Sequence, residues 1–212
     1  ERLIGKGAAG NLSSTKTGSS PLHVASHGGH LKVVEMLLAH GVDVHRLSLK
    51  GHSSLFAASL EGHLDVVEML IGKGANVNQL TTKGTTPLAQ AAANGHCSVV
   101  EMLLEHGANA NLIGHTHGLP LHAASHNGHE DLVEILINKG AGVDATRTDG
   151  RTSLQLAAAK GHSAVVRVLL AAGAKIWDDV HVFGPGSPDD PAMLWAIPRA
   201  AVVEMKRSID AT

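Results

Sequence analysis

Apolar and polar positions alternate along this chain in a pattern that returns every 33 residues. A leucine opens the first apolar segment of each copy, and alanine, valine, glycine and a Gly-His pair return at further fixed places. The frame continues through five copies without an insertion, and such self-similarity is typical of stacked structural repeats. The leucines that mark the five copies are Leu22, Leu55, Leu88, Leu121 and Leu154.

The copy at residues 84–116 shows which elements each repeat predicts. Thr86 suits the N-cap of a short alanine-rich helix and Pro87 suits its first residue, and an Asn-Gly pair predicts the turn that follows. The next segment, SVVEMLLEHGA, carries a wide apolar stripe and outward glutamates, which predicts an amphipathic second helix. Gly107 suits the left-handed residue that ends this helix, and the polar segment NANLIGHTH predicts a hairpin finger.

These features resemble the ankyrin repeat family. The resemblance covers residues 18 to about 174 and is carried by segments such as SSPLHVASHGGHLKVVEMLLAHGVDV and GTTPLAQAAANGHCSVVEMLLEHGANAN. It implies an all-α repeat solenoid, an ankyrin array of helix-turn-helix units joined by hairpin fingers. Two copies depart from the family's T-P-L-H motif, with Ser54 and Ser153 in place of its proline, and its histidine is kept only as His23 and His122.

The same frame predicts how the chain divides. Residues 1–17 are interpreted as the end of a truncated upstream repeat, since LIGKGAAG near the start echoes LIGKGANV in the second copy. Residues 178–212 are interpreted as a linker and a degenerate C-terminal capping repeat, because a terminal repeat needs a polar outer face. A segment that binds a partner or a following domain is the alternative for this end. The ankyrin repeats are expected at 18–50, 51–83, 84–116, 117–149 and 150–177.

Composition limits the kind of protein. A formal net charge of −2 provides no global positive field to attract nucleic acid or an anionic membrane, and no apolar run approaches the ~20 residues of a membrane span. Cys97 is the only cysteine, which excludes an internal disulfide and favours an intracellular location, in the cytoplasm or nucleus. Because the first residue is Glu1, the chain is interpreted as a fragment of a longer protein, and we expect it to be monomeric. Three of the four aromatic residues either close the end of the stack or bind a partner: Trp177, Phe183 and Trp195.

Five histidines between residues 115 and 129 raise the question of a metal site. Three of them, His122, His126 and His129, have a spacing that could place ligands on one face of a helix. The first copy has the same spacing, so the scaffold explains it, and the helix is expected to end near Ser125, which removes the shared face. No metal site and no cofactor are therefore predicted. No catalytic group is predicted either, since the one cysteine follows a histidine directly and adjacent residues on a helix do not face each other.

A stacked array presents a long concave surface made of fingers and first helices, and it has no deep pocket by default. The resemblance implies a protein–protein interaction module, a scaffold or adaptor, that binds a partner protein on this surface. The alternative is a targeting or substrate-recruiting arm of a larger enzyme, ubiquitin ligase or channel that lies outside these residues. Neither nucleic acid nor a membrane is expected as a partner, and the chain itself is not expected to be an enzyme.

The charge pattern predicts the chemistry of the partner. The fingers are mildly basic and the second helices carry glutamates on the other side, which favours a partner with acidic and apolar character. The alternative is that these charges only keep a long array soluble. Leu60 is the candidate apolar anchor, because neither the core nor a cap explains it. The predicted concave binding residues are Lys16, His27, Lys50, His52, Leu60, Lys83, Asn94, His115, His126, Asn127, Arg151 and Lys160.

Overall fold

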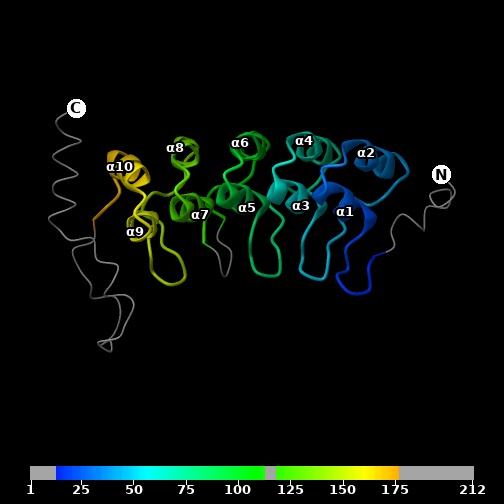
Figure 1. The fold of residues 1–212 in the computed structure, drawn as a ribbon, viewed down its shortest axis with the longest axis horizontal. Coiled ribbons are helices and arrows are strands. Elements are labelled where there is room, and N and C mark those ends of the chain that lie inside the picture. The colour runs from blue at the N-terminus through cyan, green and yellow to red at the C-terminus, as the bar shows by residue number, and fades with distance from the viewer. Residues whose placement is uncertain (1–12, 113–117, 177–212) are drawn as a thin grey trace.

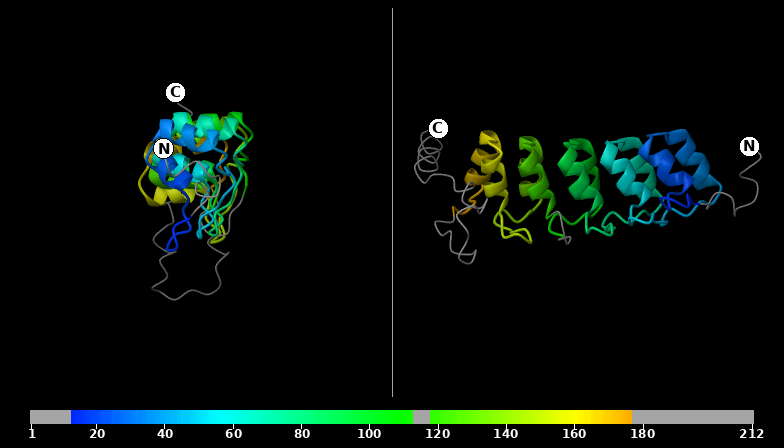
Figure 2. Two further views of the ribbon diagram at one scale, coloured as in Figure 1. Left: turned by 90° about the vertical axis from the view of Figure 1, so that its right-hand side faces the viewer. Right: turned by 60° about the horizontal axis from the view of Figure 1, so that its bottom comes forward.

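A computed structural model describes residues 13–112 and 118–176 as a single row of helix pairs (Figure 1). Each pair lies within one of the 33-residue copies. The first helices of the pairs form one row and the second helices the other, and loops project from the row of first helices (Figures 1 and 2). The helices are α1 Pro21–His27, α2 Leu31–Ala39, α3 Ser54–Glu61, α4 Leu64–Gly72, α5 Pro87–Asn94, α6 Cys97–Glu105, α7 Pro120–Asn127, α8 Glu130–Asn138, α9 Ser153–Ala159 and α10 Ser163–Ala171.

This arrangement confirms the predicted all-α repeat fold. The part of the chain that the structure describes contains no strand, and its only β-type pairing is an isolated bridge between Thr146 and Thr152. Within the same part, no helix is both long and apolar enough to cross a bilayer.

The local signals that start and end the helices act as predicted in the third copy. The Thr86 hydroxyl accepts the backbone N–H of Ala89 at 3.0 Å, and Pro87 is the first residue of α5. Gly107 follows α6 with φ +84°, the left-handed conformation that suits a residue without a Cβ. In this copy a polar N-cap therefore starts the first helix, and a glycine in the left-handed conformation follows the end of the second.

The predicted end of the fourth copy's first helix is wrong by two residues. Helix α7 continues past Ser125 to Asn127 and ends at Gly128, which has φ +79°. The helix stops where a left-handed residue can be accommodated, and Gly128 is that residue. His126 therefore does lie on the same helix as His122, whereas His129 precedes the next helix.

The core combines large leucines with small alanines. The repeated leucines of the first helices are at most 3% exposed, and full burial of one such side chain contributes roughly 1.5–3 kcal/mol. Neighbouring first helices approach closely because a fully buried alanine recurs in their contact. These alanines are Ala58, Ala91, Ala124 and Ala157.

Buried histidines join the repeats through the backbone. The ring of His122 accepts the backbone N–H of Leu119 at Nδ1 (3.0 Å) and donates from Nε2 to the carbonyl of Ala145 (2.8 Å). His23 has the same arrangement in the first copy, with its Nε2 2.8 Å from the carbonyl of His52. Since a carbonyl only accepts, both rings are held as the neutral Nε2-protonated tautomer.

The histidine of the Gly-His pair connects each repeat to the one before it. In four successive copies its Nε2 donates to a carbonyl at the end of the preceding first helix, at 3.0–3.1 Å. These hydrogen bonds fix the spacing of the first helices along the concave side. The pairs are His63 with His27, His96 with Leu60, His129 with Ala93, and His162 with His126.

Candidate functional site

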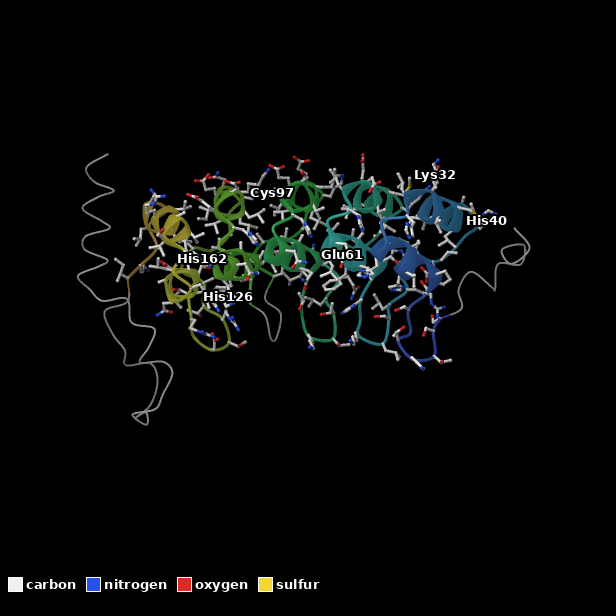
Figure 3. The ribbon with its side chains drawn as sticks, viewed as in Figure 1. Lys32, His40, Glu61, Cys97, His126 and His162 are labelled. Carbon is white, nitrogen blue, oxygen red and sulfur yellow. The ribbon has the colours of Figure 1, made fainter. Side chains whose placement is uncertain are left out.

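The candidate site is the concave side of the array, formed by the fingers and the C-terminal ends of the first helices. Figure 3 shows His126 and Glu61 on this side, whereas Cys97 and Lys32 lie on the side of the second helices. Successive fingers touch through their backbones, since the N–H of Leu49 donates to the carbonyl of Thr17 at 3.0 Å. The N–H of Thr82 donates to the carbonyl of Lys50 at the same distance. The first three fingers thus form a continuous surface.

The predicted binding residues differ in how much of each side chain reaches the surface. His115 lies outside the described residues. Four residues are half-buried: His52, Leu60, His126 and Arg151. Seven are exposed: Lys16, His27, Lys50, Lys83, Asn94, Asn127 and Lys160.

Two of the predicted binding residues also hold the array together. The amide nitrogen of Asn94 donates to the carbonyl of Leu60 at 2.7 Å, and that of Asn127 donates to the carbonyl of Ala93 at 2.8 Å. Each of these carbonyls also accepts a Gly-His histidine, so both lone pairs of the oxygen are used. Sequence reasoning missed this contact, although an Asn before the Gly-His pair in two adjacent copies is the signal that could have found it.

The concave side of the first two repeats has a histidine–carboxylate contact beside packed rings. Nδ1 of His27 lies 3.5 Å from a carboxylate oxygen of Glu61, and both side chains are well exposed, so this pair stabilises the fold little. The ring of His52 stacks on Phe56, with 4.6 Å between the ring centroids. Burial lowers the pKa of His52, and the positive charge of Lys50 lowers it further. The His52 ring is therefore uncharged at neutral pH and packs against Phe56.

A basic cluster, consisting of His126, Arg147, Arg151 and Lys160 with Asp149 among them, lies at the fourth and fifth repeats. Burial is the largest cause that lowers the pKa of the His126 ring, and the charges of Lys160, Arg147 and Arg151 lower it further. Three cations from one finger and the end of α9 thus act on a residue of α7. Sequence reasoning named three of these residues but could not show that they converge.

The carboxylate of Asp149 organises the finger part of this cluster. Its Oδ2 accepts Nη2 of Arg151 at 2.6 Å and Nε at 2.9 Å, and it lies 3.5 Å from Nη2 of Arg147. Burial alone would raise the pKa of Asp149, but the hydrogen bonds from Arg151 and the charge of Arg147 outweigh it, so the pKa is lowered. Asp149 is therefore ionised at neutral pH and holds two guanidinium groups in one place.

The family of the chain follows from its match to a family model. The model for ankyrin repeats matches three overlapping stretches, residues 1–81, 43–114 and 88–179. The chain belongs to the ankyrin repeat family. Ankyrin repeats generally act as protein–protein interaction modules and are typically non-catalytic. No curated protein matches the chain.

The ankyrin scaffold accounts for two histidines of the stretch that began as a possible metal site, His122 and His129. Both ring nitrogens of His122 are used by backbone groups, and Nε2 of His129 binds a carbonyl of the previous repeat. In the described part of this array, no group of three or more histidine, cysteine or acidic side chains is placed to hold a metal ion. Cys97 is half-buried, and its Sγ lies 3.8 Å from the carbonyl of Gly95.

Proposed function

We propose that this ankyrin array is a scaffold or adaptor that binds a partner protein on its concave side. The observation that carries the proposal is a difference in the balance of charge between the two sides, each of which carries charges of both signs. Exposed lysines such as Lys50 and Lys160 belong to the fingers and first-helix ends, whereas the second helices carry a row of exposed carboxylates. This row consists of Glu35, Glu68, Glu101 and Glu134.

The same separation supports a partner with acidic and apolar character. Opposite charges on two binding surfaces steer their encounter and suppress wrong partners. Leu60 supports the apolar part of the proposal, since its side chain is half-buried near the end of α3 and Asn94 of the next repeat binds its carbonyl. Its carbonyl is fixed by two hydrogen bonds, so the side chain is presented in a defined position.

The surface would serve equally in a free-standing adaptor and in the recruiting arm of a larger enzyme, ubiquitin ligase or channel. The single cysteine supports a reducing location inside the cell, in the cytoplasm or nucleus. We propose a monomer in solution, which sedimentation equilibrium of the isolated chain tests directly.

The experiment that tests the proposal is affinity capture from native cell extract, read by mass spectrometry. A double variant, Leu60→Glu with His126→Glu, places two carboxylates on the concave side. The matched control, Met36→Glu with His106→Glu, makes the same kind of change at exposed positions of the second-helix row. All three proteins must first show the same melting temperature.

Loss of a partner from the concave variant alone supports the proposal. Equal capture by all three proteins would contradict it and would move the search to the second helices. If the partner lost from the concave variant alone is basic, the concave surface is supported but the proposed acidic character of the partner is contradicted.

A further inference from the structure

The basic cluster is built from two repeats, and its finger part is held in place before any partner arrives. Its finger is closed by a backbone hydrogen bond of 2.9 Å from Arg147 to the carbonyl of Arg151, and by the bridge between Thr146 and Thr152. Lys160 caps the end of α9 beside it. Groups held in their bound positions lose little conformational freedom when a ligand binds, which favours affinity.

The charge balance of the cluster leaves an excess of positive charge. Among the described residues, the cluster contains three cations, Arg147, Arg151 and Lys160, and one carboxylate, Asp149. Of the described residues, Lys160, Arg147 and Arg151 place positive charge near the half-buried ring of His126. The cluster therefore attracts an anion rather than neutralising itself.

Arg147 has hydrogen-bonding capacity that the described residues do not use. Its stem is packed so closely over Gly118 that a Cβ added there would lie 2.7 Å from the Cγ of the arginine. Its Nε is buried, so a ligand can approach only the part of the side chain that stays exposed, which is 22% of it. Nη2 reaches Asp149 only at 3.5 Å. A planar guanidinium with unsatisfied donors is a suitable partner for a carboxylate.

We infer that the cluster of Arg147, Arg151, Lys160 and His126 is a subsite that binds carboxylate side chains of an acidic segment in the partner protein. The inference rests on the proposed function and assigns the acidic part of the partner to the fourth and fifth repeats. Neighbouring repeats are about 10 Å apart, and a segment in the polyproline II conformation rises about 3.1 Å per residue with three residues per turn, so two carboxylates about three residues apart lie on one face and match the subsite.

A protein segment fits this subsite better than a nucleic acid does. Sites for single-stranded nucleic acid combine a continuous basic groove with aromatic side chains on which bases stack. Here Asp149 interrupts the basic cluster, Glu61 lies on the same concave side, and Phe56 is the only aromatic residue other than histidine in the described part of the chain. A few carboxylates can fit between these groups, whereas a chain of phosphates would meet repulsion.

The test uses a phage-displayed library of random 12-residue peptides, selected on the whole 212-residue chain. We expect enrichment of peptides with paired Asp or Glu residues about three positions apart. For an enriched peptide, Lys160→Glu should weaken binding about tenfold or more, because attraction becomes repulsion. Lys139→Glu is the matched control and should leave binding unchanged, since it reverses the same charge on an exposed residue that caps a second helix.

A charge swap makes the test independent of any effect on folding. A peptide in which the acidic residues are replaced by lysine should bind Lys160→Glu better than it binds the unaltered chain. Enriched peptides without acidic residues that are lost on Leu60→Glu with His126→Glu would overturn the subsite and keep the concave surface. If no peptide is enriched and the three proteins capture the same partners from cell extract, both the subsite and the proposed concave binding surface are overturned. Tighter binding of a single-stranded oligonucleotide than of any peptide would assign the cluster to nucleic acid and refute the inference.

Discussion

Replacing His122 by leucine tests whether this buried ring holds the fourth repeat to the next finger. The side chain is 1% exposed, and both nitrogens bind backbone groups, the N–H of Leu119 and the carbonyl of Ala145. Leucine fills a similar space but leaves both groups buried without a partner. Each unsatisfied group costs roughly 1–3 kcal/mol. After the gain from burying an apolar side chain, we expect a net loss of about 2–4 kcal/mol in the free energy of unfolding.

The same substitution four residues later in the same helix is the matched control. The ring of His126 is half-buried and makes no hydrogen bond to another described residue, and its backbone carbonyl, which binds His162, is unaffected by a side-chain change. His126→Leu should therefore change the free energy of unfolding by less than ~0.5 kcal/mol. Urea titration followed by circular dichroism measures both variants against the unaltered chain.

Hydrogen exchange read by mass spectrometry locates the effect, because a repeat array can lose one unit without unfolding as a whole. Peptides around Leu119 and Ala145 should exchange faster in His122→Leu, whereas those from the first two repeats should be unchanged. The reasoning fails if the two leucine variants have the same stability, or if fast exchange appears evenly along the array.

Three further measurements follow from the same contacts. Burial lowers the pKa of His23 and His122 below the ordinary value of 6.5. The stability that these neutral rings contribute is therefore complete above pH 6.5 and is lost as pH falls toward their folded-state pKa. The urea midpoint should fall when the pH is lowered from 7.5 to 5, and it should fall less in His122→Leu. Asn111→Ala removes hydrogen bonds of 2.9 Å to the carbonyl of Gly140 and 2.8 Å from the N–H of Gly142, which should cost about 1–2 kcal/mol and speed amide exchange at residue 142; unchanged exchange there would contradict the assignment. Gly128→Ala should destabilise the array more than Gly173→Ala in the same titration. Both glycines have positive φ, so alanine costs about 1–2 kcal/mol at either position. Only at Gly128 would the added Cβ also meet the His162 ring, at 2.6 Å.

Sequence reasoning predicted those parts of the fold that depend on local chemistry. The N-cap of Thr86, the first-turn proline and the left-handed Gly107 each act within one helix, so their neighbours along the chain suffice to identify them. The predicted end of the helix at Ser125 was wrong because two polar residues before Gly128 resemble a turn but fit equally well in the last turn of a helix. The competing signals differ by too little for a single sequence to decide.

Contacts between repeats were harder to predict. Asn94 was assigned to the binding surface, yet its amide donates to a carbonyl 34 residues earlier, and nothing local to Asn94 indicates that partner. The grouping of Arg147, Arg151 and Lys160 around His126 likewise depends on how one finger folds against two first helices. Such contacts follow from packing across a whole repeat, and a periodic sequence identifies columns of residues without showing which side chains touch.

One position of the 33-residue repeat, near the end of the first helix, shows how a regular scaffold can carry a specific surface. In the first four repeats, the backbone carbonyl at this position accepts a hydrogen bond from the Gly-His histidine of the next repeat, at 3.0–3.1 Å in each case. The hydrogen bond uses the backbone, so it places no demand on the side chain at that position. The side chains accordingly vary, and they are His27, Leu60, Ala93 and His126.

This division of roles supports the proposal that the concave side is the recognition surface. A substitution at this position changes what a partner meets but leaves the hydrogen bond that holds the repeats in register, so chemistry can vary there at little cost in stability. A substitution of the buried leucines or of the Gly-His histidines has the opposite effect, because each of them is part of the contact between repeats. The side chains that the scaffold does not use, with His126 and Lys160 among them, are therefore the ones from which a binding surface can be built.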